Sequence, residues 1–221
     1  SHGRLVYSLS LSLLRPEVPP VHVVGLNSAW LAGDDNDHGK LRLTDSQILH
    51  ATMDSGIPLN GFRLALMHHP LEEMADSGVS RRLISESCDL LLHGHQHDAV
   101  ASQQTDPDRS LLTLGAGCLF EGSRGNHHPN GFHVIDVDFS PSGHPHRYVV
   151  RFRSWSPRGF WHNDSSLYAA AEHGMLEWLA THPSALGPTA DDAKTEGLLL
   201  TNPEYVGASW VPDSITRAYA R

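Results

Sequence analysis

The sequence is poor in cysteine and in long apolar runs. Cys88 and Cys118 are the two cysteines in 221 residues, which is too few for a disulfide framework and fits small buried side chains. No apolar run approaches the roughly 20 residues that a membrane-spanning helix needs, and no stretch has the pattern of a secretory signal peptide. We therefore expect a cytoplasmic protein, long enough for one domain with a substantial core.

Positive charge is also scarce. Lys and Arg together number 16 against 25 Asp and Glu, so the formal net charge is -9. A net-acidic chain without a basic block argues against bulk nucleic-acid binding by electrostatics. Histidine, in contrast, is abundant at 17 residues. Acidity beside histidine is compatible with divalent metal ions, although acidity can equally serve solubility alone.

The most informative stretch is residues 90–97, Leu-Leu-Leu-His-Gly-His-Gln-His. The three leucines predict the last part of a buried strand, and Gly94 is expected to permit a sharp turn there. His95 and His97 can then project their imidazoles into one crevice beyond the strand end, where open α/β sheets hold ligands. Imidazole is the commonest metal-binding side chain, so this stretch predicts a metal site. The alternative is a polar turn that happens to contain histidines.

Residues 62–70 repeat the same pattern, with a short apolar run followed by His68, His69 and Pro70. Two strands that each end in histidine, with a helical segment between them, indicate a βαβ arrangement. Parallel neighbouring strands would bring both histidine sets to the same edge of the sheet, which makes coincidence less plausible.

These stretches resemble motifs of the calcineurin-like metallophosphoesterase superfamily. Residues 94–97 resemble its G-H-x-H motif, residues 67–70 its upstream histidine motif, and residues 21–30 the strand and loop that precede both in bacterial members. The match in order and spacing runs from about Val21 to Ser156. It implies an α/β fold, a partial metallophosphoesterase sandwich of mixed β-sheets flanked by helices. It also implies hydrolysis of a phosphomonoester or phosphodiester at a dinuclear metal site.

The resemblance also implies roles for individual residues. His68 and His95 would bind one divalent ion and His97 its neighbour, the ions being Mn, Fe or Zn in the complete domain. The resemblance leaves the catalytic acid unassigned. Four further side chains are candidates for substrate contact or for support of the ligands: Asn27, His69, His93 and Asp98.

Three motifs that precede these in the family are missing, namely D-x-H, G-D-x-x-D and G-N-H-D/E. Residues 33–37 spell the second and residues 125–128 nearly spell the third, but both lie in the wrong order. We therefore expect Asp34, Asp37 and Asn126 to lie away from the histidines. The chain is predicted to be the C-terminal half of the domain, with an uncovered apolar face or edge and little activity by itself.

Residues 1–158 are assigned to this half-domain, and residues 159–221 to an appended region with an alanine-rich helix over 167–181, a linker and a less regular tail. Thr44 and Gln47 form a capping pattern for a helix that ends near Ser55, and a second helix is expected over 79–87. The predicted strands are 4–14, 21–26, 62–67, 90–93, 99–103, 111–114, 131–139 and 147–155.

Two functions remain open at this point. The chain is part of a phosphoesterase whose substrate is a phosphorylated small molecule, a nucleotide or a phosphoprotein, or it is a non-catalytic, degenerate module used for binding or regulation. The partner expected in either case is the missing N-terminal half of the domain. A structural zinc-binding domain is a weaker hypothesis, because such sites use four protein ligands that fill the coordination sphere, commonly cysteines.

Overall fold

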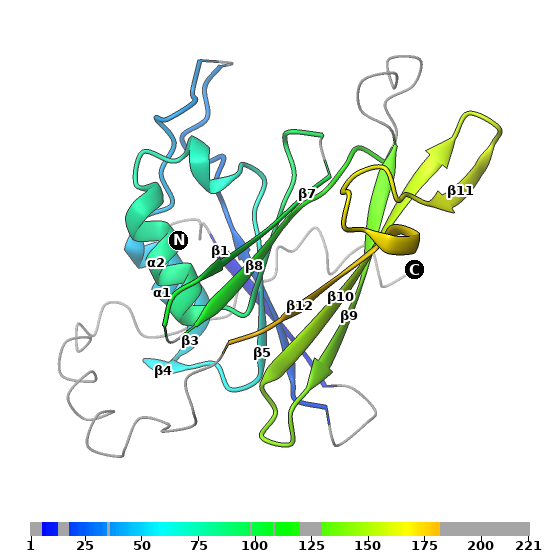
Figure 1. The fold of residues 1–221 in the computed structure, drawn as a ribbon. Helices are drawn as coiled ribbons and strands as arrows, with labels where there is room; N and C mark the ends of the chain where they lie inside the picture. Colours follow the sequence, from blue (N-terminus) through cyan, green and yellow to red (C-terminus); the bar gives the residue numbers. More distant parts are fainter. Residues whose placement is uncertain are drawn as a thin grey trace, which may run out of the picture.

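The computed structural model describes residues 6–12, 18–34, 36–97, 99–107, 109–119 and 130–181. These residues form three layers, with helices on one face of a six-stranded sheet and a four-stranded sheet on the other (Figure 1). One hydrophobic core lies between the helices and the first sheet, and another lies between the two sheets. The prediction of a mixed α/β sandwich is therefore confirmed.

The first sheet has the strand order β1-β2-β5-β6-β8-β7. Its four central strands run parallel, whereas β1 and β7 are antiparallel edge strands. The carboxyl ends of β5 and β6 therefore lie side by side, as the two histidine stretches predicted. The strands are β1 (Val6–Leu11), β2 (Val21–Leu26), β5 (Phe62–Leu66), β6 (Leu90–His93), β7 (Val100–Thr105) and β8 (Ser110–Gly115).

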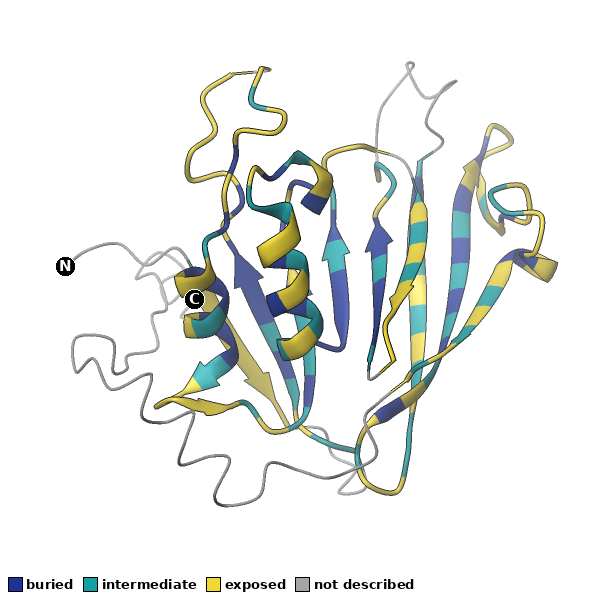
Figure 2. Cartoon of the chain, turned by 60° about the vertical axis from the view of Figure 1, so that its left-hand side comes forward, coloured by how far each residue is buried: buried dark blue, intermediate teal, exposed yellow. Residues whose placement is uncertain are grey.

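Two helices, α1 (Asp45–Thr52) and α2 (Ser77–Ser87), cover the outer face of the first sheet (Figure 2). Thr44 caps α1 as predicted, because its Oγ1 accepts a hydrogen bond from the backbone N–H of Gln47 at 3.4 Å. Asp76, just before α2, accepts from the Thr44 N–H at 2.9 Å and so links the two helix starts. Among the described residues, none of the helices is long and apolar enough to cross a membrane.

Short elements join these helices to the strands. A small hairpin of β3 (Met53–Asp54) and β4 (Ile57–Pro58) follows α1, and the 3-10 turn η1 (Leu71–Glu73) precedes α2. The hairpin was not predicted, whereas η1 lies in residues 71–78, which were expected to be mobile or partly helical. Leu41 forms an isolated bridge with Met74, so the loop after β2 packs beside η1.

The second sheet is built around β10, which pairs with all three other strands. Tyr148, Val150 and Phe152 on its inner face are buried against the first sheet. The Tyr148 hydroxyl donates to the backbone oxygen of Asp89 at 2.9 Å, which fixes the two sheets to each other. Its strands are β9 (Gly131–Phe139), β10 (Pro145–Ser156), β11 (Phe160–Asn163) and β12 (Met175–Leu179).

The helix predicted over 167–181 is wrong. The chain instead makes a short turn, η3 (Glu172–Gly174), and then pairs with β10 as β12. Gly174 has φ +72 and packs against the backbone of Asp164, which stops a helix, and the alternating burial of Leu176 and Trp178 suits a strand. The predicted boundary at 158 therefore lies too early, and the rest of the appended region, 182–221, falls outside the described residues.

One part of the first sheet is left uncovered by the residues that the structure describes. Tyr7, Leu9 and Leu11 lie opposite Gly25, Val23 and Val21 in the antiparallel pair, so they point to the same face as those residues. Val21 packs into the core between the two sheets, so this is the face that the second sheet packs against. Their exposed fractions are nevertheless 44%, 51% and 42%. The second sheet covers β5, where Phe139 of β9 contacts Phe62, but leaves β1 open.

Candidate functional site

The two histidine loops are joined directly at the carboxyl edge of the first sheet. The N–H of Met67 donates to the oxygen of Leu92 at 3.0 Å, and the N–H of Gly94 donates to the oxygen of His68 at 3.0 Å. The parallel ladder of β5 and β6 thus continues past the strand ends, which brings residues distant in the sequence together. His68 and His95 face one another as a result.

Three imidazoles form what we call the histidine cluster, namely His68, His69 and His95. One ring nitrogen from each lies within 4.8 Å of the others. Nε2 of His68 and Nδ1 of His95 are 3.2 Å apart. Two nitrogens that bind one tetrahedral ion at roughly 2.0–2.1 Å are separated by about 3.3 Å, so this spacing fits two ligands of a single ion.

A carboxylate that the sequence did not reveal stands beside the cluster. Oε2 of Glu73 lies 3.5 Å from Nε2 of His95, and the Glu73 side chain is only 12% exposed. Glu73 comes from η1, and its backbone oxygen accepts from the N–H of Gly39 at 2.9 Å. The acidic pair after Pro70 was the only available signal, and it did not show which carboxylate turns toward His95.

Ser28 holds the base of the cluster and is almost completely buried, with 2% of its surface exposed. Its Oγ accepts from the backbone N–H groups of His68 at 3.2 Å and His69 at 3.0 Å. The same Oγ lies 3.1 Å from Nδ1 of His69. The end of β2 therefore positions the loop that follows β5.

Two imidazoles of the cluster, His68 and His69, are shifted toward the neutral form. Burial is the main cause that lowers the pKa of His68, and the neighbouring His95 adds to it. Burial likewise lowers the pKa of His69, with further contributions from His68 and His95. Neutral imidazole is the form that binds metal ions, so this environment suits a metal site.

His97 is not part of this group of three. It is exposed, it lowers the pKa of His68 slightly, and it lines a separate cavity of about 260 Å³ with His133 and Leu167. His95 and His97 both have positive φ, at 72° and 59°, whereas Gly94 does not. The expectation that Gly94 makes the turn is thus wrong, and the uncommon backbone angles fall on the histidines themselves.

The four secondary candidates differ in position. Asn27 makes a turn, since its Oδ1 accepts from the N–H of Ala29 at 3.0 Å, and its side chain is exposed. His93 is buried, and its Nδ1 lies 3.2 Å from the oxygen of Gly94. His69, expected to support the ligands, lies within the cluster. Asp98 lies outside the described residues.

Two stretches match family motifs in the wrong order, residues 33–37 and residues 125–128. Asp37 accepts hydrogen bonds from the backbone N–H groups of Gly33 and Asp34, which are the main causes that lower its pKa. His69 makes the smallest contribution to that shift, so Asp37 lies within electrostatic range of the cluster. Asn126 is outside the described residues.

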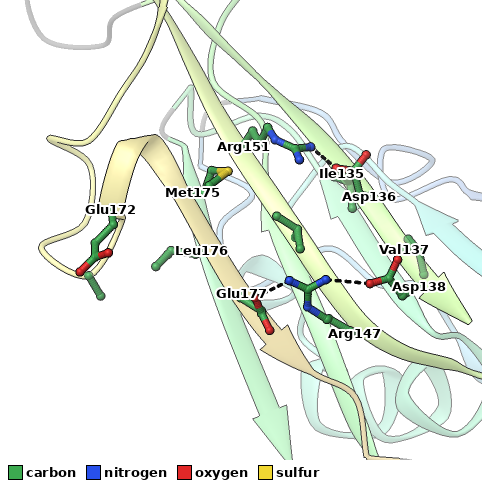
Figure 3. Close-up of a pocket in the computed structure, with 12 residues that line it drawn as sticks. Ile135, Asp136, Val137, Asp138, Arg147, Arg151, Glu172, Met175, Leu176 and Glu177 are labelled. Atoms are coloured by element: carbon green, nitrogen blue, oxygen red, sulfur yellow. Dashed lines mark hydrogen bonds and ion pairs between the residues drawn. The ribbon is translucent and has the colours of Figure 1, made fainter.

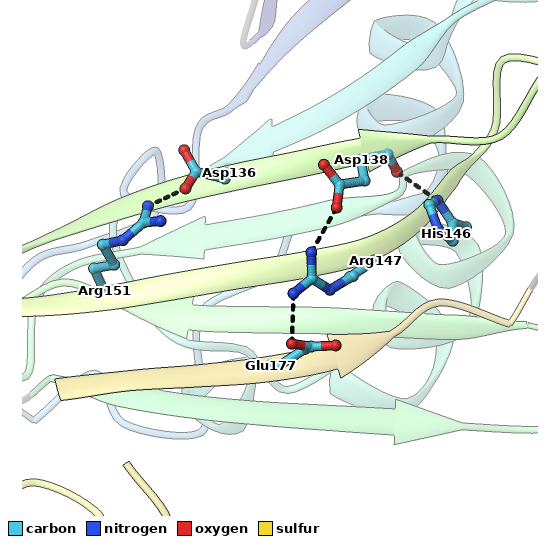
Figure 4. A network of polar contacts seen from close by, with 6 residues as sticks. All are labelled: Asp136, Asp138, His146, Arg147, Arg151 and Glu177. Atoms are coloured by element: carbon cyan, nitrogen blue, oxygen red, sulfur yellow. Dashed lines mark hydrogen bonds and ion pairs between the residues drawn. The ribbon is translucent and has the colours of Figure 1, made fainter. Parts of the chain in front are cut away.

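A cavity lies elsewhere, on the outer face of the second sheet. Its volume is about 810 Å³, and it is lined by residues of β9, β10, β12 and the turn before β12 (Figure 3). Arg147 bridges Asp138 at 2.8 Å and Glu177 at 2.7 Å, and Arg151 pairs with Asp136 (Figure 4). We call these five residues the ion-pair ladder. Because the charges of the ladder are paired with one another, the histidine cluster is the stronger candidate.

Comparisons with known proteins add little. No protein-family model matches the sequence, and no curated protein matches it either. The fold is similar to the crystal structure of a conserved uncharacterized protein, a predicted phosphoesterase, from Streptococcus pneumoniae TIGR4, with a TM-score of 0.30 and 11% identity. The similarity covers 79% of this chain and 98% of that one. A TM-score of this size carries no argument about function, so the geometry of the site has to carry it.

Proposed function

We propose that the chain is the histidine-bearing half of a metal-dependent phosphoesterase that hydrolyses a phosphomonoester or a phosphodiester. The observation that carries this proposal is the 3.2 Å separation of the His68 and His95 ring nitrogens at the carboxyl edge of a parallel sheet. This spacing suits two ligands of one Zn, Fe or Mn ion. The order of the motifs along the sequence supports the same activity.

His68 and His95 would hold one ion, and Glu73 is placed to orient His95 through its far nitrogen. His97 would serve a second ion beside the first. A pair of divalent ions supplies an activated water and stabilises charge on the phosphoryl oxygens. The protein's own contribution is to fix the imidazoles, which the Ser28 hydrogen bonds and the β5–β6 ladder do.

We further propose that a complementary half-domain covers the open face of β1. Tyr7, Leu9 and Leu11 form an apolar strip on the inner face of the sandwich, where the second sheet stops short. An uncharged, apolar edge strand of this kind tends to associate. We expect chain 1–221 to self-associate at high concentration, and the substitution Leu9→Ser together with Leu11→Ser to reduce this in analytical ultracentrifugation.

The test of activity compares two chains. Chain 1–221 and a chain extended upstream are assayed with Mn²⁺ or Zn²⁺ on bis(4-nitrophenyl) phosphate. The longer chain is expected to turn over with metal, whereas the short chain is expected to be slow because it lacks the bridging carboxylate. Equal metal-dependent turnover by both would contradict the half-site proposal.

The second candidate function is a non-catalytic binding module of the same fold. It is favoured by the shortage of carboxylates at the cluster, because Glu73 is the one acidic side chain at ion-pair distance from its imidazoles among the described residues. This reading predicts metal or ligand binding without turnover, even in the extended chain. The same assay therefore separates the two functions.

A further inference from the structure

The hydrogen bonds at Ser28 determine which nitrogen of His69 is available. A serine hydroxyl offers one donor and two acceptor lone pairs. The N–H groups of His68 and His69 occupy both lone pairs, at 3.2 Å and 3.0 Å. The hydroxyl hydrogen then has to point at Nδ1 of His69, which is 3.1 Å away.

This arrangement favours one tautomer of His69, and a contact with the backbone of Ser28, the smallest of the influences on the His69 pKa, acts in the opposite sense. Nδ1 accepts the hydrogen from Ser28, so in the neutral ring the proton sits on Nε2. The opposite tautomer would place a third donor on Ser28 Oγ and leave the hydroxyl hydrogen unsatisfied in a residue that is 2% exposed. A buried unsatisfied polar group is costly, which disfavours that arrangement.

We propose that His69 is a hydrogen-bond donor to an anionic phosphoryl oxygen of the substrate, and that it does not bind the metal ion. This inference rests on the proposed function and assigns a role to the third member of the cluster. Nε2–H has no lone pair for a metal ion, although the ring stands 4.6 Å from that of His95, centroid to centroid. A donor beside His68 and His95 can contact an oxygen bound next to them.

Ser28 is then a positioning residue that acts through His69. It selects the donor tautomer, and its two accepted backbone hydrogen bonds hold the loop in which His68 and His69 lie. A donor that is fixed before the ligand arrives strengthens interactions with developing charge without reorganisation. The chemistry recognised is that of a tetrahedral oxyanion, such as phosphate.

The tautomer is tested first, on metal-free chain 1–221 labelled with ¹⁵N-histidine. Two-bond ¹⁵N–¹H spectra are expected to show His69 protonated on Nε2, and Ser28→Ala to convert it to a mixture of tautomers. His69 protonated on Nδ1 would overturn the inference. This measurement uses no metal ion, so its outcome is separate from that of the proposed function.

The donor role is tested with Zn²⁺-loaded chain and inorganic phosphate by titration calorimetry. His69→Leu is expected to weaken phosphate binding by about tenfold or more, the usual value of a hydrogen bond to a charged group. His69→Gln, which keeps an N–H donor at the position of Nε2, is expected to restore most of it. Zn²⁺ affinity should change by less than about threefold in both variants, whereas His68→Ala should abolish it.

Two results would contradict the donor role. One is a loss of Zn²⁺ affinity in His69→Leu as large as that in His68→Ala, which would make His69 a ligand. The other is phosphate binding by the Zn²⁺-loaded chain that is absent or that does not depend on His69. If the chain binds no Zn²⁺ at all, the proposed function fails, and the tautomer measurement still decides the arrangement at Ser28.

Discussion

The histidine cluster and the ion-pair ladder differ in how far their ionisable groups are paired with groups of opposite charge. In the ladder, each arginine of β10 meets a carboxylate from a neighbouring strand, so the charges cancel at the surface. In the cluster, three like groups face one another with a single described carboxylate, Glu73, at ion-pair distance. Charges that are already paired offer a ligand little binding energy, whereas the imidazoles of the cluster can still bind a metal ion. This difference is why we propose the cluster, and not the ladder, as the functional region.

The largest effect is expected in the pH dependence of stability, where a buried histidine and the paired surface charges of the ladder should act in different pH ranges. Burial lowers the pKa of His133 from 6.5 to about 4. The unfolded state therefore binds more protons, and stability falls as the pH decreases from 6.5 to about 4, by up to about 3 kcal/mol.

His133→Phe should flatten this dependence in urea unfolding at pH 7 and pH 4.5. The ladder acts in a lower window, because the hydrogen bond from Arg147 lowers the pKa of Glu177 and its contribution is lost only as the pH falls below the ordinary value of 4.5. An unchanged slope in His133→Phe would show that this histidine does not drive the dependence.

Metal binding should stabilise the chain through the cluster and not through the ladder. Zn²⁺ at about 100 times its Kd should raise the free energy of unfolding by about 2.7 kcal/mol. The gain should vanish in His68→Ala and in His95→Ala, and persist in Arg151→Ala, the matched control on the ladder. Differential scanning calorimetry with and without Zn²⁺ measures it, and an equal loss in all three variants would remove the distinction.

Ser28→Ala should cost about 2 kcal/mol, because it leaves the backbone N–H groups of His68 and His69 without their buried acceptor. Ser102→Ala, on an exposed position of the edge strand β7, is the control and should change little. Urea unfolding of both variants checks this. Equal stability of the two would mean that Ser28 does not hold the histidine loop.

The smallest effect is expected for the ladder itself. Arg147→Ala and Arg151→Ala remove exposed ion pairs, whose contribution to stability is small and is screened by salt. Their unfolding midpoints should stay close to that of the unmodified chain at high ionic strength. A large loss in either variant would give the ladder a structural role that its exposure does not suggest.

The positions of the strands could be predicted because their signals are local. The apolar runs that end in His68 and in His93 predicted β5, β6 and their parallel pairing, and the structure confirms both. The capping pattern likewise predicted the start of α1 to within one residue. Period-two alternation and helix caps depend on neighbours in the chain, which a sequence displays directly.

The rest depended on contacts between distant residues. Alanines at 169–171 suggested a helix, but pairing with β10 made the following residues a strand, which is a tertiary override of local propensity. Glu73 and Ser28 reach the histidines through the packing of loops that the sequence leaves unspecified. His69 seemed a supporting residue by motif position, yet only the hydrogen bonds at Ser28 give it a specific role.

The most direct test of the proposed metal site is a crystal structure of the chain grown with Zn²⁺, with the ion located by anomalous scattering. We expect an ion bound by Nε2 of His68 and Nδ1 of His95 at about 2.0–2.1 Å. We expect no ion on the carboxylates Asp138 and Glu177 of the ladder. An ion on those carboxylates, with the histidine cluster empty at saturating Zn²⁺, would contradict the proposed site.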